Sequence, residues 1–504
     1  METEMKLSPK DLVGCRYRMV QRQRWGDIAP TSSALARSIR LAEAQDEVFS
    51  LLPTRASRGD TVRFSRIDIG VDTTGDLAHR VADAEAAVFE TWEALASGAT
   101  LITNPMLEVA DFRFRVAALV RRGDGNYMPV IVSNHRIARP SSRKEIAMIP
   151  TTRLGLGIQH KVAYEIKSHA HDSYTLALAA RALAEVGLSA QRGGVIGQDH
   201  HRVFILNTDL LQHGLDQALN QPIPTQARRV KECGGCKFWQ YCHDELVARD
   251  DLSLYLSGDR ANTYRDQGIN TVQGLIDAQL GTASVLAQAW RDDIAVLRQP
   301  DFSRHDIPRF DVEIDIDVEA YLDQGAYLWG TFDGDEYRNF VIWHGLGQEE
   351  EAKNFARFWD WLSTQRRQAS ANGKTVGVFC YSAHGENHWL SFSARRFSQY
   401  PGVPSEQEVR DFIQSDSWID VFALVKRSLV GPGGLGLKVV APEAGFCWEE
   451  QDVDGEESVN LFMQARAGDE HVRHRLLSYN GDDCRATRAV REWLSAGAPG
   501  SAKL

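Results

Sequence analysis

Long apolar runs are absent from this 504-residue sequence, and none approaches the roughly 20 residues that a membrane-spanning helix needs. The opening METEMKLSPKDLVGCRYR is charged and lacks the apolar core and cleavage site of a signal peptide. We therefore expect a cytoplasmic protein that does not contact a membrane. Cysteine is also scarce, and because the seven cysteines are odd in number we expect no disulfide framework.

A net positive charge is lacking as well, since 57 Lys and Arg stand against 68 Asp and Glu, for a formal charge of −11. Over the whole chain this balance argues against nucleic-acid binding. The charge is unevenly spread, however. Residues 1–250 contain 32 basic and 29 acidic side chains, whereas residues 251–504 contain 25 and 39. Such asymmetry between the two halves indicates separate domains.

The length predicts two to four domains at roughly 150 residues each. Hydrophobic periodicity and turn signals predict the elements. Helices are expected at 78–97, 171–187, 351–367 and about 482–495, a hairpin at 112–122 and 127–137 around GDGN, and strands at 310–319, 326–334 and 375–382. Residues 251–298 are expected to be helical, and the proline-containing stretch 299–311 suggests a domain boundary. Strands followed by interleaved helices indicate an α/β domain after this boundary.

Four of the cysteines are arranged in a pattern typical of a metal centre. Cys233, Cys236 and Cys242 form C-x2-C-x5-C in KECGGCKFWQYCHDEL, and Cys15 stands alone in SPKDLVGCRYRMVQ. Closely spaced thiolates can converge on one metal centre that a distant fourth ligand closes. The residues alone leave three alternatives open, an iron–sulfur cluster, a zinc site and a set of inert buried thiols. The other cysteines, Cys380, Cys447 and Cys484, are predicted to be core residues.

One N-terminal cysteine followed by a distant C-x2-C-x5-C resembles the iron–sulfur staple of RecB-like nucleases, and SPKDLVGCRYR resembles the usual start of that family. In those proteins a [4Fe–4S] cluster joins the two ends of a PD-(D/E)xK nuclease fold. Over residues 8–248 and 309–495 the chain resembles RecB-family nucleases that carry an additional RNase H-like domain. The resemblance implies an α/β multidomain protein, with a RecB-like restriction-endonuclease fold in 1–248, an RNase H-like exonuclease domain (DEDD, Tyr-type) in 301–496 and a tail in 497–504. Between them, residues 253–278 resemble one helix-hairpin-helix unit, so 249–300 is expected to be a helical, helix-hairpin-helix-like linker, with a plain helical linker as the alternative.

The same resemblance implies that the first nuclease site is inactive. A PD-(D/E)xK site needs an Asp and a Glu for Mg2+ and a Lys near the attacking water. The matching positions here are Ala117, Ile131 and Ser133, and the Gln and Tyr of the following helix are replaced by Thr175 and Ala179. Apolar side chains cannot bind a hard cation. Asp111 is the only carboxylate expected near this hairpin.

Basic residues remain along the hairpin, at Arg113, Arg115, Arg121, Arg122 and Arg136. They form either a solvated charged hairpin or a phosphate-binding face that was kept after catalysis was lost. The second alternative predicts that the first domain binds DNA.

A row of carboxylates lies in FDVEIDIDVEA. Its period of two places all of them on one face of a strand, opposite an apolar stripe. These acids are Asp311, Glu313, Asp315, Asp317 and Glu319. A hydrated face accounts for the first members, whereas D-x-E before a short turn and an apolar strand resembles the first motif of YprB/DnaQ-like exonucleases. Of the two registers, Asp317/Glu319 is preferred over Asp311/Glu313 because six residues then separate it from the next strand.

The segment SYNGDDCRATRAVREWL resembles the Y-x3-D motif of the same family, at Tyr479 and Asp483. Ser478 stands where a His-type enzyme would have its His, so the Tyr-type fits better. Both residues are predicted at the start of a helix, where an acidic helix cap is the structural alternative. For the middle motif the candidates are Glu386, which departs from the usual Asp, and Asp420. Together these residues imply two-metal phosphodiester hydrolysis with Mg2+ or Mn2+, in which Tyr479 orients the water.

The leading hypothesis is a protein of DNA repair or recombination, with a 3′–5′ exonuclease-like C-terminal domain and an inactive, DNA-binding RecB-like domain. RNA or an RNA–DNA hybrid is an alternative substrate, and a helicase is a candidate partner. A second hypothesis is a non-catalytic iron–sulfur DNA-binding protein in which both nuclease cores are degenerate. A third, a redox-responsive scaffold, has no supporting motif.

Overall fold

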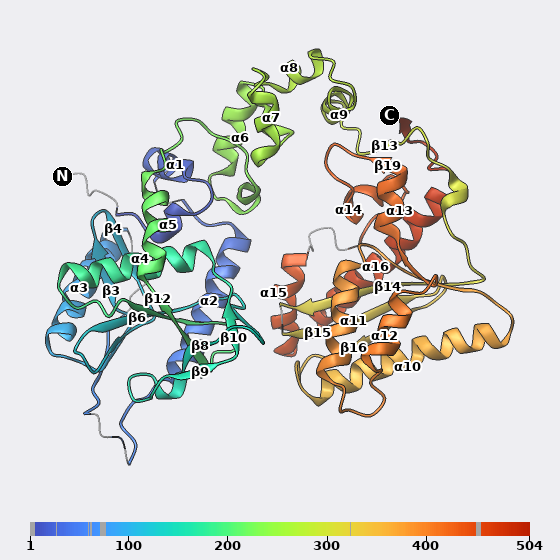
Figure 1. Ribbon diagram of the computed structural model, residues 1–504. Coiled ribbons are helices and arrows are strands. Elements are labelled where there is room, and N and C mark those ends of the chain that lie inside the picture. Colours follow the sequence, from blue (N-terminus) through green and yellow to red (C-terminus); the bar gives the residue numbers. More distant parts are fainter. Residues whose placement is uncertain are drawn as a thin grey trace. The chain divides into compact units, whose positions relative to one another are not determined.

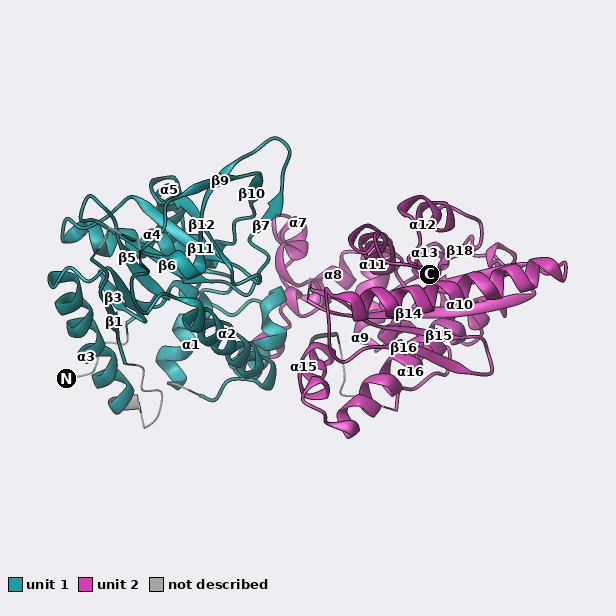
Figure 2. Ribbon diagram, turned by 90° about the horizontal axis from the view of Figure 1, so that it is seen from below, with its two compact units in different colours: residues 1–245 teal, residues 246–504 magenta. Residues whose placement is uncertain are grey.

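The computed structural model describes residues 6–26, 28–58, 60, 63–70, 77–322, 324–449 and 455–504. The chain divides into two compact units, residues 1–245 and 246–504 (Figure 2). Each unit contains its own sheet and its own hydrophobic cores. Within the described ranges, no helix combines the length and the apolar character needed to cross a membrane.

A mixed eight-stranded sheet organises unit 1. In spatial order its strands are β1 (Arg66–Asp68), β2 (Leu101–Thr103), β5 (Ala118–Arg121), β6 (Tyr127–Val132), β11 (Arg192–Ile196), β12 (Arg202–Asn207), β8 (Ile146–Pro150) and β9 (His160–Val162). The antiparallel pair β5–β6 confirms the hairpin predicted around GDGN, with Ala118 opposite Val130. On its other side β6 runs parallel to β11.

The strand predicted over 112–122 is interrupted. β4 (Phe112–Arg115) pairs with β3 (Met106–Val109) as a separate ribbon, whereas β5 begins only at Ala118. The prediction of one continuous strand was wrong because its two halves belong to different sheets. Their burial differs accordingly, since β4 alternates buried and partly exposed residues while the first three residues of β5 are all buried.

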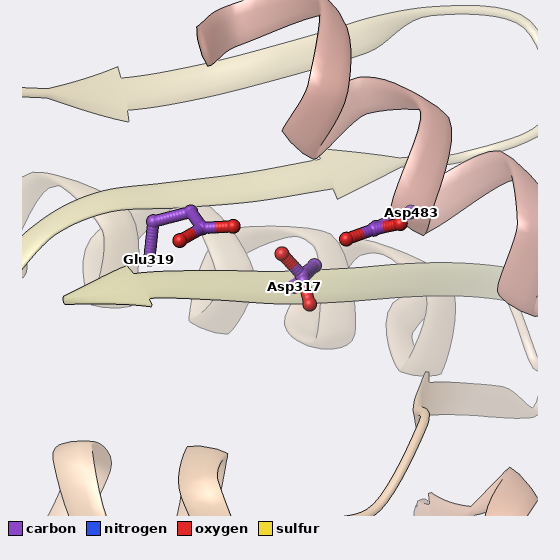
Figure 3. Close-up of side chains that lie close together, drawn as sticks. All are labelled: Asp317, Glu319 and Asp483. Atoms are coloured by element: carbon purple, nitrogen blue, oxygen red, sulfur yellow. The ribbon is translucent and has the colours of Figure 1, made fainter. Parts of the chain in front are cut away.

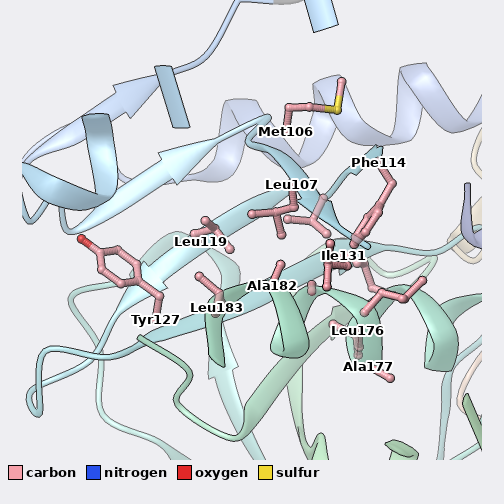
Figure 4. Packing of buried hydrophobic residues seen from close by; sticks show 14 of the residues in the cluster. Met106, Leu107, Phe114, Leu119, Tyr127, Ile131, Leu176, Ala177, Ala182 and Leu183 are labelled. Atoms are coloured by element: carbon pink, nitrogen blue, oxygen red, sulfur yellow. The ribbon is translucent and has the colours of Figure 1, made fainter. Parts of the chain in front are cut away.

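Helices α2 (Ser32–Leu51) and α4 (Ala170–Glu185) pack on opposite faces of the large sheet of unit 1. The other helices are α1 (Tyr17–Trp25), α3 (Leu77–Ala96), α5 (Asp209–Asn220) and α6 (Trp239–Ala248), which runs across the boundary between the two units. α3 and α4 confirm the helices predicted at 78–97 and 171–187. α4 brings Leu176 and Leu183 into one core with Leu119 and Ile131 (Figure 4). On the opposite face Val48 of α2 joins a second core with Val120, Met128 and Val130.

Smaller elements complete unit 1. They are the strand pair β7 (Ala138–Pro140) and β10 (Tyr164–Ile166), and the short 3-10 helices η1 (Pro9–Leu12), η2 (Thr151–Arg153) and η3 (Lys231–Gly235).

Unit 2 begins with a small helical region that confirms the helical prediction for 251–298. Its elements are η4 (Leu252–Leu254), η5 (Gly258–Ala261), α7 (Asn262–Arg265), α8 (Val272–Asp277) and α9 (Thr282–Arg291), packed around a core of their own. β13 (Leu297–Arg298) then pairs with β19 (Leu429–Val430) and with β20 (Ala502–Lys503). The segment 497–504, predicted as a tail, therefore contains a paired strand.

A five-stranded sheet forms the centre of unit 2. Its order is β16 (Tyr337–Val341), β15 (Gly325–Phe332), β14 (Val312–Tyr321), β17 (Val376–Cys380) and β18 (Trp418–Asp420). β14 is antiparallel to β15 and parallel to β17. Strands β14, β15 and β17 confirm the three strands predicted after the boundary.

Two groups of helices pack on this sheet (Figure 1). α10 (Glu349–Ala371), α11 (His384–Arg396) and α12 (Glu406–Ile413) share a core with Ile314 and Ile316 of β14. A second core is formed by α13 (Val421–Ser428), α14 (Leu437–Val440), α15 (Gly455–Arg466) and α16 (Glu470–Ser495). α16 contacts β14 directly on the face that carries the acids. α10 confirms the helix predicted at 351–367.

The last helix begins earlier than predicted. α16 starts at Glu470, where the Asp469 side chain accepts hydrogen bonds from the backbone amides of the first turn. The expectation that Tyr479 and Asp483 stand at a helix start was wrong, since both lie well inside α16. Gly481 lies inside the helix, and its small size admits the Tyr337 ring, which lies 3.3 Å from the position of a Cβ atom at residue 481.

Candidate functional site

Three of the predicted carboxylates converge on the acidic face of β14. Asp317 and Glu319 are two residues apart on this strand, and α16 brings Asp483 to them (Figure 3). One oxygen of each side chain lies within 4.8 Å of the other two. Throughout the described parts of the chain, no other group of three His, Cys, Asp or Glu ligand atoms is as close. Carboxylate oxygens are the ligands that Mg2+ and Mn2+ prefer.

Removal from water raises the pKa values of these three carboxyl groups, and their mutual repulsion adds to the effect at Asp317 and Glu319. The pKa of Glu319 rises to about 8 through burial and the nearby Asp483 charge. Burial also raises the pKa of Asp483, to about 6, and that of Asp317 lies well above its ordinary value. Three acids in this environment become stable anions only beside a positive charge. A divalent cation would supply it.

Asp317 is held by a buried hydrogen-bond relay. The side-chain amide of Asn480 donates to Asp317 Oδ2 at 2.6 Å, and the Tyr337 hydroxyl donates to Asn480 Oδ1 at 2.7 Å. Gly330 makes room for this relay, because a Cβ atom there would lie 1.7 Å from Asn480 Oδ1. Asn480 itself is fully buried. The relay fixes the orientation of Asp317 beside the other two acids.

Neutral donors also hold the other two acids. Trp448 Nε1 donates to Asp483 Oδ1 at 2.7 Å, and the Tyr479 hydroxyl forms a second hydrogen bond to Asp483. Ser458 Oγ donates to Glu319 Oε2 at 3.0 Å. Because these donors carry no charge, they orient the carboxylates without neutralising them.

Lys438 of α14 contributes the positive charge next to this cluster. Its Nζ lies 5.0 Å from the Tyr479 ring centroid and 5.6 Å from that of Trp448. Its charge lowers the pKa values of Glu319 and Asp483, against the larger effect of burial. The sequence analysis missed Lys438, Trp448 and Asn480. Asn480 lies inside the Y-x3-D motif, so its position next to Tyr479 could have identified it. Lys438 and Trp448 belong to no motif that the sequence shows.

The two middle-motif candidates occupy different environments. Glu386 lies on α11, and burial followed by the Asp420 charge raises its pKa to about 8. Its Oε2 atom is buried and has no hydrogen-bond partner among the described residues. The Glu386 charge raises the pKa values of Asp317 and Glu319, so it lies near the cluster, although outside the 4.8 Å group. Asp420 instead caps α13 by accepting from the amides of Phe422 and Ala423.

The first two acids of β14 form buried ion pairs and do not belong to the carboxylate cluster. Glu313 and Asp315 are buried and bind Arg491 of α16, at 2.6 Å for Glu313 and at 2.8 and 2.9 Å for Asp315. The expectation of a hydrated face was therefore wrong for these two, because an equally buried guanidinium replaces water. Asp311 is exposed and accepts hydrogen bonds from Thr375.

The four cysteines of the predicted metal centre line one small pocket of unit 1, together with Gln21, Phe238 and Trp239. Burial raises the pKa of Cys242 to about 11. No three of the cysteine sulfur atoms in the described residues lie within 4.8 Å of one another. A single zinc ion with Zn–S bonds of about 2.3 Å would need sulfur separations of about 3.8 Å. A polynuclear cluster spans larger sulfur separations than a single ion does.

Hydrogen bonds to sulfur support two of these cysteines. Gln21 Nε2 donates to Cys242 Sγ at 3.3 Å, and the Val230 amide donates to Cys233 Sγ at 3.3 Å. Of the three remaining cysteines, Cys380 and Cys484 are buried as predicted. Cys447 is exposed, which corrects the prediction. Its neighbours Phe446 and Trp448 pack against each other, so the side chain between them faces solvent.

Three residues that the sequence analysis aligned with a nuclease site, Ala117, Ile131 and Thr175, line a cavity of about 350 Å³. The expectation that Asp111 is the only nearby carboxylate was wrong. α4 brings Asp172 to this cavity, where it accepts a hydrogen bond of 2.7 Å from Ser133 Oγ. Ala179 is buried within α4. The described residues place no group of three close metal ligands in this cavity.

The five predicted DNA-binding arginines lie in three places. Arg113 binds Glu108 at 2.8 Å and Arg115 lies 3.7 Å from Asp83. Arg121 and Arg122 line a large cleft, whereas Arg136 lines a smaller one with Tyr164. These side chains therefore do not line a single cavity.

Comparison with protein families matches residues 314–495 to the RNase H superfamily. The match runs from β14 to α16 and includes all three clustered carboxylates. Unit 2 contains an RNase H-like domain. The match confirms the predicted RNase H-like domain in the C-terminal half and indicates nuclease-like processing of nucleic acid. No curated protein and no solved structure matches the chain.

Proposed function

We propose that the RNase H-like domain is a metal-dependent nuclease that hydrolyses phosphodiester bonds at Asp317, Glu319 and Asp483. The observation that carries the proposal is the convergence of these three acids within 4.8 Å inside the segment that matches the RNase H superfamily. Mg2+ or Mn2+ held there would activate a water molecule and stabilise the leaving oxygen.

The surrounding side chains have separate roles in this proposal. Tyr479 donates to Asp483 and orients the attacking water. Lys438 contacts a phosphate of the substrate, because it adds a positive charge beside a cluster of acids that would repel the substrate. Glu386, whose buried Oε2 lacks a partner among described residues, is a further metal ligand. Asn480 positions Asp317.

Unit 1 is, in the same proposal, an inactive RecB-like domain that binds DNA and contains a [4Fe–4S] cluster on Cys15, Cys233, Cys236 and Cys242. The shared pocket and the N–H···S hydrogen bonds support the cluster. The cluster would join the residue stretch directly before α1, near one end of the unit, to η3 and α6 near the other. The family resemblance favours a 3′–5′ exonuclease of DNA repair or recombination that works beside a helicase.

The test is a cleavage assay with the full chain and Mn2+ on end-labelled single-stranded DNA, duplex DNA and RNA–DNA hybrid. Asp317→Ala and Asp483→Ala should each abolish cleavage, and so should chelation of the metal. Asp311→Ala is the matched control, because it removes an exposed acid that lies directly before β14 and outside the cluster. Cleavage that survives both cluster variants would overturn the proposal and favour the non-catalytic DNA-binding hypothesis. Labels at the 5′ and 3′ ends distinguish the two polarities.

A further inference from the structure

A cleft of about 1000 Å³ opens in unit 1 at one end of β5, away from the cysteine pocket. Its walls come from Asp60 and Arg63, from the turn after β5 and from the loop between η2 and β9. Five of its residues are basic, and Asp60 is the one acid among the described residues that line it. The basic residues are Arg63, Arg121, Arg122, Arg153 and His160.

Most of the positive charge in this cleft is not neutralised. Asp60 forms an ion pair with Arg153 at 2.5 Å. Neither Arg63 nor Arg122 has an ion-pair partner within the described part of the chain. Arg121 makes one long hydrogen bond to the Gly98 carbonyl, at 3.4 Å. In contrast, Arg113 and Arg115 of the β4 ribbon face acids, so their charge is largely compensated.

The floor of the cleft is apolar. Leu156, which is partly exposed, and Ile158, with 80% of its surface exposed, form its exposed part, whereas Val120, Met128 and Ile149 on the sheet face that α2 covers elsewhere are only 1–5% exposed and form its buried base. Gly98 lies next to Arg121, and a Cβ atom there would approach Arg121 NH1 to 3.2 Å. This glycine therefore lets the guanidinium lie close to the backbone at the edge of the floor.

We propose that this cleft binds a single strand of nucleic acid, with its phosphates along the arginines and its unpaired bases against the apolar floor. Grooves for single strands combine a positive lining with side chains, usually aromatic, on which the bases stack, and here the exposed apolar side chains of Leu156 and Ile158 take that place. The cleft is at the upper end of the roughly 300–1,000 Å³ typical of small-molecule pockets, which is more than one phosphate needs. A duplex keeps its bases stacked inside and cannot use the floor. The inference deepens the DNA-binding role proposed for unit 1 and rests on it.

The test measures binding of fluorescein-labelled oligo-dT to the full chain by anisotropy, in EDTA and in the Asp483→Ala background, so that cleavage does not interfere. Arg63→Ala/Arg122→Ala should weaken binding at least tenfold. It should also reduce the slope of log K against log salt by about 1.4, since each phosphate contact of a single strand contributes about 0.7. Arg63→Lys/Arg122→Lys should keep most of the slope. The matched control Arg143→Ala/Arg192→Ala removes two exposed arginines of the same unit outside the cleft and should leave both quantities unchanged.

Unchanged affinity and slope in the correctly folded Arg63→Ala/Arg122→Ala variant would overturn the inference. Inorganic phosphate that displaces the labelled strand as well as unlabelled oligo-dT does, at the same total phosphate concentration, would also overturn it. The cleft would then be a site for a small anion. Tighter binding of a blunt duplex through the same arginines would do so as well. Because the measurement excludes cleavage, failure of the proposed nuclease activity leaves its result unaffected.

Discussion

The side chain of Asn480 hydrogen-bonds to Asp317 at 2.6 Å, although 163 positions separate the two residues in the sequence. This bond joins α16 to β14 at the place where the three acids meet. Residues that hydrogen-bond a metal ligand without contacting the metal commonly contribute about 10–100-fold to metal affinity or activity.

Asn480→Ala should therefore weaken Mn2+ binding by about 10–100-fold, because Asp317 loses its donor and can rotate. Titration calorimetry with Mn2+, together with the Mn2+ dependence of cleavage, measures the effect. Tyr337→Phe removes only the outer hydrogen bond of the relay and should have a smaller effect. Unaltered Mn2+ affinity in Asn480→Ala would show that Asp317 is held by other contacts.

The stability of the metal-free protein should fall as the pH rises from about 4.5 to 8. The pKa of Glu319 in the folded state, about 8, lies above its unfolded value, so the folded state binds its proton more tightly. That stabilisation is complete below the unfolded pKa and is lost as the pH approaches 8. Mn2+ competes with the proton, so the Tm increase that it causes should be larger at pH 8.5 than at pH 6. Thermal melts with and without Mn2+ test this, and Asp483→Asn should flatten the dependence. An Mn2+ effect that is equal at both pH values would contradict the prediction.

Lys438→Met should slow cleavage by about 100-fold, the order observed when one donor to a developing charge is removed. Mn2+ affinity should not fall, because Lys438 repels the cation while it attracts the substrate phosphate. Single-turnover rates at saturating Mn2+ measure the effect, and Lys438→Arg should restore part of the rate. Cleavage at the normal rate in Lys438→Met would remove this residue from the proposed site.

Cys236→Ala should remove the brown colour and most of the iron and sulfide of protein purified without oxygen, since one of the four cluster ligands is lost. The matched control is Cys447→Ala, because this cysteine is exposed and lies outside the cysteine pocket. Iron, zinc and acid-labile sulfide are determined for each protein. A colourless wild-type protein with one zinc per chain would contradict the cluster.

Arg491→Met should destabilise unit 2 by about 3–5 kcal/mol, because it leaves Glu313 and Asp315 buried without a counter-charge. Urea denaturation followed by tryptophan fluorescence measures the change. Adding Glu313→Gln and Asp315→Asn to Arg491→Met should recover much of the loss, since the unpaired charges disappear. A loss below about 1 kcal/mol in Arg491→Met would mean that water replaces the guanidinium.

Many elements of the fold were predictable because they depend on local periodicity. Alternating side chains marked β14, and helical spacing marked α3, α4 and α10. The D-x-E and Y-x3-D patterns led to Asp317, Glu319 and Asp483, the three acids that the structure brings together. Spacing also directed attention to the four cysteines, which share a pocket.

Other features depend on contacts between distant segments and escaped prediction. Asp172 reaches the cavity lined by Ala117 and Ile131 only because α4 packs across the sheet. Lys438 and Trp448 become neighbours of Asp483 only through the packing of α14 and the following turn against α16. Residues 112–122 form two strands because they pair with different partners.

The sequence by itself determined which residues alternate along β14, since the period of a strand is a local property of its backbone. It also supplied the acids, but it did not distinguish the ones that form a cluster from the ones that are neutralised. Only the tertiary structure decided this. Arg491 reaches Asp315 across 176 positions and forms an ion pair, whereas no arginine is within ion-pairing distance of Asp317 among the described residues. Two acids of the same strand face thus differ because charge compensation depends on which helix residue packs opposite each one.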